Sequence, residues 1–202
     1  MGTDATLASL HSHSTNHSFM KTQNLYFIAI VPDGAIRQKV KALKEEMKAR
    51  FNAKHALKSP AHITLIPPFK RDQTHENFLC DNLSQFATEQ ESIKVELSGF
   101  RSFPPRVIYI DVRHPDQIKN IHSSLCHKLL TNMLFHPDEL KSKLHPHMTI
   151  ATRDLTKEAY NQAWLEFEKR AFSENFQVKS LFLLKHNGKF WDIFKEFEFQ
   201  AI

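Results

Sequence analysis

Two four-residue segments of this chain share one pattern: a histidine, an apolar residue, a threonine and a second apolar residue. They are His62-Ile63-Thr64-Leu65 and His147-Met148-Thr149-Ile150. Chance produces about 0.1 such matches in a chain that contains 13 histidines. On a β-strand, residues i and i+2 lie on one face, and residues i+1 and i+3 lie on the other. The pattern therefore predicts two equivalent strands, each with an anchored apolar face and with a histidine and a threonine on the opposite face.

The first half of the chain alternates between apolar runs and segments with helical spacing. Apolar and aromatic residues predict strands over 24–31 and 61–69, and apolar residues at helical intervals predict helices over 36–51 and 78–86. Pro32-Asp33-Gly34 predicts the turn after the first strand, and Pro67-Pro68 is expected to end the second strand. This half is predicted to run strand, helix, strand, helix.

The second half repeats this rhythm and adds strands. A hairpin-like pair is predicted over 93–100 and 107–112, followed by a helix over 118–133, a short strand over 148–151 and a helix over 160–171. Two final strands are predicted over 176–185 and 189–199. Asn187-Gly188 joins them, and this pair is preferred in a two-residue type I′ turn.

The order of the segments suggests two similar halves. We predict an α+β fold with two pseudo-symmetric lobes of mainly antiparallel sheet, helices on the outside and a central cleft that binds the ligand. Residues 1–19 are rich in Ser, Thr and His and are expected to form a flexible leader. Residues 20–202 are expected to form a single bilobal domain.

Charge and composition exclude several classes of protein. Lys and Arg number 27 against 22 Asp and Glu, but acids lie among the bases along most of the chain, unlike the basic patch of a dedicated duplex binder. Cys80 and Cys126 lack the spacing of a disulfide framework or a thiolate zinc site. The longest apolar run, around Leu25 to Val31, is far shorter than the roughly 20 residues of a membrane span. We expect a cytoplasmic protein that has no membrane partner and acts as a monomer.

The repeated pattern suggests acid–base chemistry on a phosphate group. Two such strands that face each other would present two imidazoles and two hydroxyls to one small ligand. Near neutral pH one imidazole accepts a proton while the other, protonated, donates one, which is what in-line phosphoester cleavage requires. The threonine hydroxyls would donate hydrogen bonds to non-bridging oxygens as charge develops on them. This scheme needs no metal or other cofactor, and the two similar motifs leave open which histidine is the acid.

A family resemblance rests on these motifs and on the sequence between them. The paired strands, the segment from Gly99 to Ile110 and the run His145-Pro146-His147-Met148-Thr149 together resemble the 2H phosphoesterase superfamily. That superfamily includes the bacterial RNA 2′,3′-cyclic phosphodiesterases historically called 2′-5′ RNA ligases. The resemblance covers about residues 24–199.

The resemblance implies a bilobal fold and a role for each motif residue. His62 and His147 would be the catalytic acid and base, and Thr64 and Thr149 would bind the phosphate. The implied substrate is an RNA end or a small nucleotide with a 2′,3′-cyclic phosphate or a 2′-5′ linkage, cleaved without a metal or other cofactor. Close relatives often carry arginine as His-x-Thr-x-x-Arg, whereas this chain has Thr152 there and Arg153 one place later. The sequence leaves the role of Arg153 open.

Other interpretations of the same residues remain open. The cleft of a non-catalytic module could hold an RNA end or a nucleotide without cleaving it, and the same fold could join 2′-5′ ends. The chain has no nucleotide-activation motif such as a P-loop, which favours cleavage over ligation. His145 and His147 also form a His-x-His pair, but no nearby carboxylate or cysteine completes a metal site.

Several further residues have a structural and a functional interpretation. Tyr109 and Phe69 could stack on a base, although a place in the core is favoured for both. Lysines and arginines around the first motif could steer a phosphate, although a solvated rim is favoured. These cations are Lys54, Lys58, Lys70 and Arg71. The histidines outside the motifs and the leader, among them His114, His122, His127 and His136, are expected at the surface.

Overall fold

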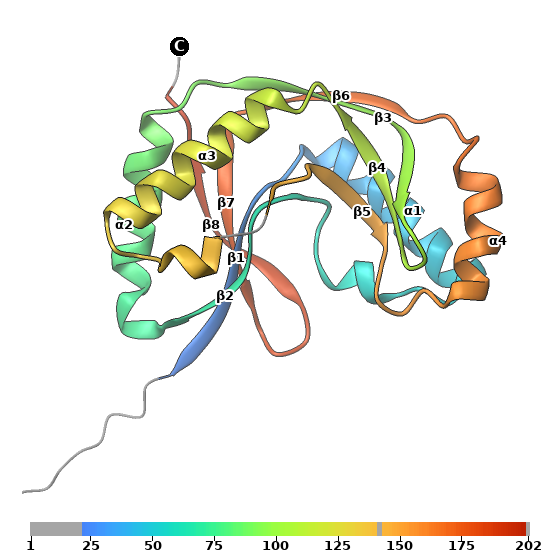
Figure 1. Cartoon of the computed structure of the whole chain (residues 1–202), viewed down its shortest axis with the longest axis horizontal. Coiled ribbons are helices and arrows are strands. Elements are labelled where there is room, and N and C mark those ends of the chain that lie inside the picture. The colour runs from blue at the N-terminus through green and yellow to red at the C-terminus, as the bar shows by residue number, and fades with distance from the viewer. Residues whose placement is uncertain (1–21, 141–142, 201–202) are drawn as a thin grey trace, which may run out of the picture.

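The computed structural model of the chain describes residues 22–140 and 143–200, so the leader predicted at residues 1–19 lies outside the described residues. The described residues form two four-stranded antiparallel sheets and four α-helices, which confirms the predicted α+β fold with two lobes (Figure 1). None of the described helices is long and apolar enough to cross a membrane.

Each sheet places one motif strand at its edge. In the first sheet the order is β2 (Ile63–Asp72), β1 (Gln23–Ile30), β7 (Ser180–His186) and β8 (Trp191–Glu198). In the second sheet it is β5 (His147–Ala151), β4 (Val107–Arg113), β3 (Ile93–Phe103) and β6 (Ser173–Val178). The edge strands β2 and β5 contact each other across the lobes. This contact brings the two motifs to the middle of the molecule.

The helices cover the outside of the two lobes (Figure 1). They are α1 (Gly34–Phe51), α2 (Glu76–Thr88), α3 (Asp116–Thr131) and α4 (Lys157–Phe167), with short 3₁₀ helices η1 (His55–Lys58), η2 (Gln73–His75) and η3 (Pro137–Leu140). Helix α1 follows β1 of the first sheet but packs on β5 of the second, near α4. Helix α2 packs on β8 and on α3. Each lobe is therefore built from segments that are distant in the sequence, and one cluster of buried apolar side chains includes residues of both sheets.

The sequence of α1 explains where this helix begins, which face it buries and where it ends. The Asp33 carboxylate accepts a hydrogen bond of 3.0 Å from the backbone N–H of Ile36, which caps the first turn. The apolar residues that recur at helical intervals are buried: Ile36, Val40, Leu43 and Met47. Asn52 adopts a left-handed backbone with φ of 54° and ends the helix. One charged residue, Lys44, is buried on the same face.

The alternation predicted for the two motifs is present in the structure. The apolar positions are fully buried: Ile63, Leu65, Met148 and Ile150 are each at most 1% exposed. His62, Thr64, His147 and Thr149 are all partly exposed. A shift of register by one residue would exchange the two faces, so burial of the apolar residues fixes the direction of the polar ones.

The prediction that Pro67-Pro68 ends the second strand is wrong, because β2 continues to Asp72. Both prolines lie in an edge strand, where a missing N–H breaks no pairing on the open side. A register shift in the pairing of β1 with β2 accommodates them, since Ile28 pairs with Ile66 and Tyr26 with Phe69.

The prediction of a single strand over 176–185 is also wrong. Phe176 and Val178 end β6, which pairs with β3 in the second sheet, whereas β7 begins at Ser180 and pairs with β1 in the first. The buried positions change phase here, from Phe176 and Val178 to Leu181 and Leu183. The chain crosses from one lobe to the other at Lys179, where the sequence has no turn signal such as Gly, Pro, Asn or Asp.

The predicted two-residue turn at Asn187-Gly188 is in fact a loop over residues 187–190. The side-chain oxygen of Asn187 accepts hydrogen bonds from the backbone N–H groups of Lys189 and Phe190, at 2.9 and 2.8 Å. These bonds form an Asx turn, and Gly188 supplies a φ of 98°. Asn187 thus stabilises a four-residue loop that ends at Phe190, directly before β8.

The N-cap of α1 gives a prediction about stability. Replacing Asp33 by alanine removes the acceptor for the Ile36 N–H and should lower the free energy of unfolding by about 1 kcal/mol. Asp33→Asn keeps a capping oxygen and should lower the free energy of unfolding by only a few tenths of 1 kcal/mol. Urea denaturation of the three proteins measures the difference. Equal stability of the alanine and asparagine variants would contradict the assignment.

Candidate functional site

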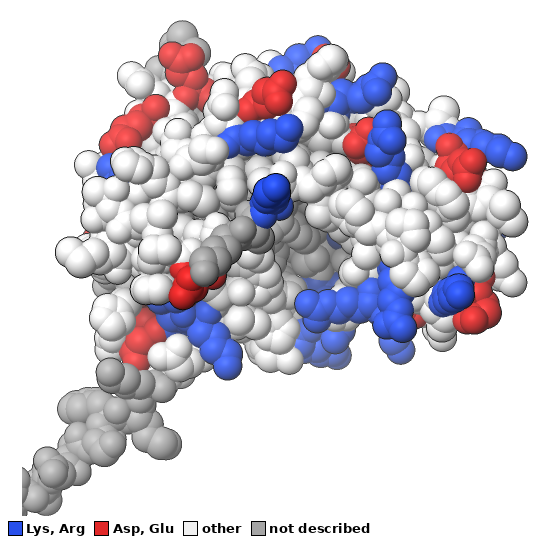
Figure 2. Space-filling model, viewed as in Figure 1, with Lys and Arg blue, Asp and Glu red and all other residues white. Residues whose placement is uncertain are grey.

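The motifs meet at a cavity between the two lobes. Figure 2 shows the surface hollowed there, with lysine and arginine side chains gathered along its lower edge. The cavity has a volume of about 210 Å³, and three of the four motif residues line it: His62, Thr64 and Thr149. The remaining wall contains Phe27, Lys44, His55, Ala56, Lys58, Ser59, Pro68, Thr152, Arg153 and Trp191.

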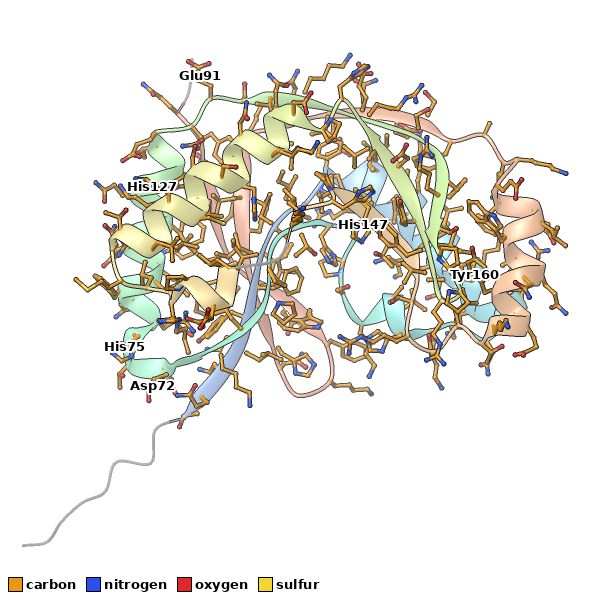
Figure 3. All side chains as sticks on the ribbon, in the orientation of Figure 1. Asp72, His75, Glu91, His127, His147 and Tyr160 are labelled. Atoms are coloured by element: carbon orange, nitrogen blue, oxygen red, sulfur yellow. The ribbon has the colours of Figure 1, made fainter. Side chains whose placement is uncertain are left out.

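The fourth motif residue, His147, lies beside this cavity and is not part of its wall. It begins β5 near the middle of the molecule (Figure 3). Its ring packs against the rings of Phe103 and Tyr109, with centroids 5.3 and 5.0 Å away. His147 is close enough for its charge to lower the pKa of His62. The structure thus brings His62, Thr64 and Thr149 to one cavity and places His147 next to it.

Both motif histidines are oriented by the same backbone contact. Nδ1 of His62 lies 2.8 Å from the carbonyl oxygen of Pro60, and Nδ1 of His147 lies 2.6 Å from that of His145. Because a carbonyl oxygen only accepts, each Nδ1 carries the hydrogen and donates it. In the neutral ring the lone pair is then on Nε2, which is free to accept a proton. Each motif holds its imidazole through the residue two places earlier in the chain.

Burial keeps both rings neutral near pH 7. Burial, followed by the positive charge of Lys44, lowers the pKa of His62 to about 4. Burial also lowers the pKa of His147, and a charge on His145 acts in the same direction. An anion bound between the rings would favour their protonated forms and oppose these shifts. The site is therefore suited to bind a negatively charged group and to exchange protons with it.

Lys44 is a site residue that the sequence analysis missed. It is only 2% exposed, and its Nζ donates hydrogen bonds of 3.0 and 3.2 Å to the carbonyl oxygens of Ser59 and Pro60. The Pro60 oxygen is also the acceptor for His62, so one carbonyl joins the lysine to the imidazole. Burial lowers the pKa of Lys44 to about 8. The sequence signal that could have found it is its spacing, four residues after the buried Val40.

Arg153, whose role the sequence left open, lines the cavity. Its backbone is left-handed with φ of 59°, an uncommon conformation for a residue other than glycine. The backbone N–H of Asp154 donates to the Thr152 oxygen at 2.7 Å, which closes a γ-turn around Arg153. The Asp154 carboxylate accepts hydrogen bonds from the backbone N–H groups of Lys54 and His55, at 3.0 and 2.9 Å. These bonds tie the loop after β5 to the segment before β2.

The other cations near the first motif have different positions. Lys58 lines the cavity, and Lys54 and Lys70 are exposed. Arg71 instead forms an ion pair of 2.8 Å with Glu139 and donates to the Leu134 carbonyl oxygen. Arg71 therefore joins β2 to η3 and is not part of the cavity wall.

Some of the aromatic residues near the motifs are buried in the core, and others line the cavity. Phe69 and Tyr109 are buried, 8% and 2% exposed, as the favoured interpretation expected. Trp191, which the sequence did not single out, lines the cavity and contacts Phe27 with ring centroids 4.7 Å apart. It lies at the start of β8, and its proximity to the motifs depends on the pairing of β7 with β1.

The remaining histidines of the described chain are dispersed. His114, His127 and His136 are exposed, and His122 is partly buried, with its Nε2 3.4 Å from the sulfur of Cys126. His145 Nε2 lies 3.2 Å from the Tyr109 hydroxyl. Within residues 22–140 and 143–200, no group of three or more His, Cys, Asp or Glu side chains could hold a metal ion.

Several known proteins are similar to this chain in sequence or in fold. The family model of the 2′-5′ RNA ligase superfamily matches residues 31–190. A curated protein of Geobacillus sp. strain WCH70, named "Putative phosphoesterase", is 26% identical over 176 residues, 85% of this chain and 94% of that protein. Its counterpart in Geobacillus kaustophilus strain HTA426 is 27% identical with the same coverage. The structure of E. coli LigT complexed with 3′-AMP is similar with a TM-score of 0.62 at 14% identity, over 89% of this chain and 100% of that one.

The link between Lys44 and His62 gives a prediction about protonation. In an NMR titration, His62 should titrate near pH 4. Replacing Lys44 by methionine removes a neighbouring positive charge, so the pKa of His62 should rise, although burial will keep it below the usual 6.5. Lys44→Arg keeps the charge and should leave the pKa close to the wild-type value. A wild-type His62 that titrates at 6.5, or one that is unaffected in the methionine variant, would contradict the electrostatic account.

Proposed function

The chain belongs to the 2′-5′ RNA ligase superfamily, and on that basis we propose that it cleaves 2′,3′-cyclic or 2′-5′ phosphodiesters of RNA or small nucleotides. The proposed mechanism is acid–base catalysis by His62 and His147 without a metal or other cofactor. One observation carries the proposal: both imidazoles are oriented by equivalent carbonyl contacts, beside a cavity lined by the motif threonines.

The proposed reaction assigns one function to each group. One histidine accepts a proton from the attacking water at Nε2 as the oxygen bonds to phosphorus. The other histidine, protonated at Nε2, donates its proton to the sugar oxygen as the P–O bond breaks. A cyclic phosphate then becomes a phosphate monoester, and the two histidines have exchanged protonation states. Thr64 and Thr149 donate hydrogen bonds to non-bridging oxygens on which negative charge increases.

Charge and shape support a phosphate ligand. Lys44, Lys58 and Arg153 line the cavity, and among the described residues no aspartate or glutamate is part of its wall. Three cations around one cavity favour an anion and stabilise the charge that develops during phosphoryl transfer. The E. coli LigT structure is complexed with 3′-AMP, and such a monoester is the product expected from opening a cyclic phosphate.

The same groups support ligation of 2′-5′ ends as an alternative reaction. If a sugar hydroxyl replaces water as the nucleophile, the base accepts its proton and the acid protonates the oxygen of the opened cyclic phosphate. A 2′,3′-cyclic end would then be joined to another RNA end without nucleotide activation. We propose hydrolysis as the main reaction, because water is the more abundant nucleophile.

The roles proposed for the two motif histidines give the first functional prediction. His62→Ala and His147→Ala should each lower kcat for a 2′,3′-cyclic nucleotide by about 10²- to 10⁴-fold, since each removes one proton-transfer group. A phosphatase-free assay that contains EDTA and follows the released monoester by chromatography measures this effect.

A matched control for this assay is His127→Ala, which removes an exposed histidine of α3 that lies away from His147 (Figure 3). It should retain wild-type turnover. Equal turnover in both motif variants and the wild type, or complete loss of wild-type turnover in EDTA, would refute the mechanism.

The lowered pKa values give a prediction about pH. The base works above its own pKa and the acid works below its own, and burial lowers the pKa of both histidines from 6.5. The maximum of kcat/KM against pH should therefore lie below 6.5, with activity lost as pH rises because the acid loses its proton. A maximum above pH 7 would contradict the assignment of both catalytic roles to these two histidines.

A further inference from the structure

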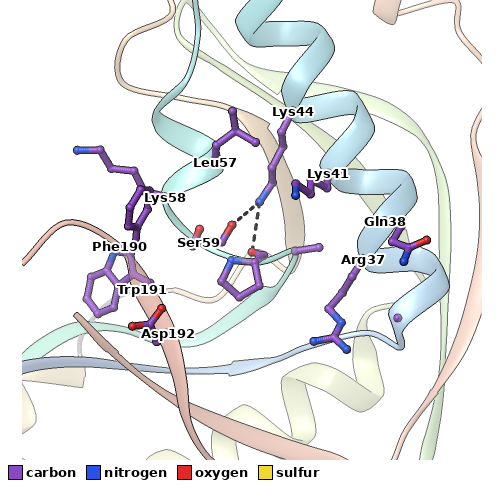
Figure 4. Close-up of a pocket in the computed structure, with 13 residues that line it drawn as sticks. Arg37, Gln38, Lys41, Lys44, Leu57, Lys58, Ser59, Phe190, Trp191 and Asp192 are labelled. Atoms are coloured by element: carbon purple, nitrogen blue, oxygen red, sulfur yellow. Dashed lines mark hydrogen bonds between the residues drawn. The ribbon is translucent and has the colours of Figure 1, made fainter. Parts of the chain in front are cut away.

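A second and larger cavity lies next to the histidine cavity. Its volume is about 480 Å³, and it is lined by residues of α1, of the segment 57–61 and of the segment 190–192 at the start of β8 (Figure 4). Lys44, Lys58, Ser59 and Trp191 line both cavities. The two cavities are therefore adjacent, and a ligand long enough to pass the shared residues would contact both.

The lining of this cavity is strongly cationic. Arg37, Lys41, Lys44 and Lys58 line it, against a single acidic residue of the described chain, Asp192. The Asp192 carboxylate accepts a hydrogen bond of 2.7 Å from the side chain of Asn187. The net charge of the lining favours an anionic ligand with more than one charge.

The cations of α1 that line the cavity differ in ion pairing from the other cations of this helix. Lys39 and Arg50 of α1, which do not line the cavity, form ion pairs with Glu174 and Glu166. Arg37 and Lys41 are exposed, and no carboxylate of the described chain lies within ion-pair distance of either side chain. Helix α1 therefore keeps its unpaired charge on the side that lines the cavity.

The size of the histidine cavity indicates that it holds only part of a substrate. Its 210 Å³ is below the roughly 300 Å³ at which small-molecule sites usually begin. The second cavity adds the exposed aromatic surface of Phe190, beside the partly exposed Trp191 that lines both cavities. Aromatic side chains beside a cationic groove are the combination with which proteins hold single-stranded nucleic acid.

From these observations we infer that the second cavity binds a backbone phosphate next to the reacting one, so that the substrate is an oligoribonucleotide and not a single nucleotide. The inference rests on the proposed function and names its substrate class. A mononucleotide cyclic phosphate carries one phosphate group and would leave Arg37 and Lys41 unused. An RNA chain supplies a further phosphate for these cations and a base for the aromatic side chains.

The test compares binding of two ligands that need no turnover. One is a fluorescently labelled five-nucleotide RNA that ends in a 3′-phosphate, and the other is the matching 3′-mononucleotide used as a competitor. The wild type should bind the RNA at least 10-fold more tightly. The double substitution Arg37→Glu with Lys41→Glu should weaken RNA binding about 10-fold and leave mononucleotide binding within 2-fold. The slope of log affinity against log salt should become shallower by about 0.7 for each phosphate group that the double variant no longer neutralises.

Lys157→Glu is the matched control, because Lys157 is an exposed lysine at the start of α4 and lines neither cavity. It should leave RNA binding unchanged. Thermal unfolding of all variants verifies that they fold. The inference would be overturned if the wild type bound the two ligands with equal affinity. It would also be overturned if the double variant lost affinity for the RNA and for the mononucleotide by the same factor.

Turnover separates this inference from the proposed function. If the wild type fails to open a cyclic-ended RNA but binds RNA through Arg37 and Lys41, the proposed function is wrong and the binding site remains. If the wild type opens the cyclic end and the double variant has an unchanged KM for RNA, the inference is wrong and the proposed function remains.

Discussion

The contact between β2 and β5, the edge strands of two separate sheets, is the constraint on which the site depends. Ile63 and Leu65 anchor one strand and Met148 and Ile150 the other, and a one-residue slip in either would bury the polar side chains. The geometry of the site is thus a consequence of core packing. Asp154 adds hydrogen bonds across the same junction, from the loop after β5 to the segment before β2.

Electrostatics connects this geometry to the proposed chemistry. Burial lowers the pKa of both motif histidines, and the nearby Lys44 lowers that of His62 further. A site with neutral imidazoles and several cations has an excess of positive charge that a phosphate group neutralises. Binding of such an anion would in turn favour protonation of one ring, which is the state that an acid catalyst requires.

The residues explain which parts of the fold and site could be predicted from the sequence. Local periodicity sufficed for the helices and for the faces of the motif strands, because it reports burial on one side of an element. Helix α4 begins at Lys157 and not 160, because the Thr156 side chain caps it. The crossing of the chain at Lys179 was missed because no turn residue such as Gly, Pro, Asn or Asp separates the two strands there. Lys44 and Trp191 were missed because their place in the site arises from packing between elements that are distant in sequence.

The central claim is that the two motifs act on one phosphate group. A crystal structure of the protein with 3′-AMP tests it most directly. The account predicts that the phosphate oxygens lie within hydrogen-bond distance, about 3 Å, of Nε2 of His62 and His147 and of the hydroxyls of Thr64 and Thr149. A phosphate bound elsewhere, or one that contacts only one of the two motifs, would contradict the account.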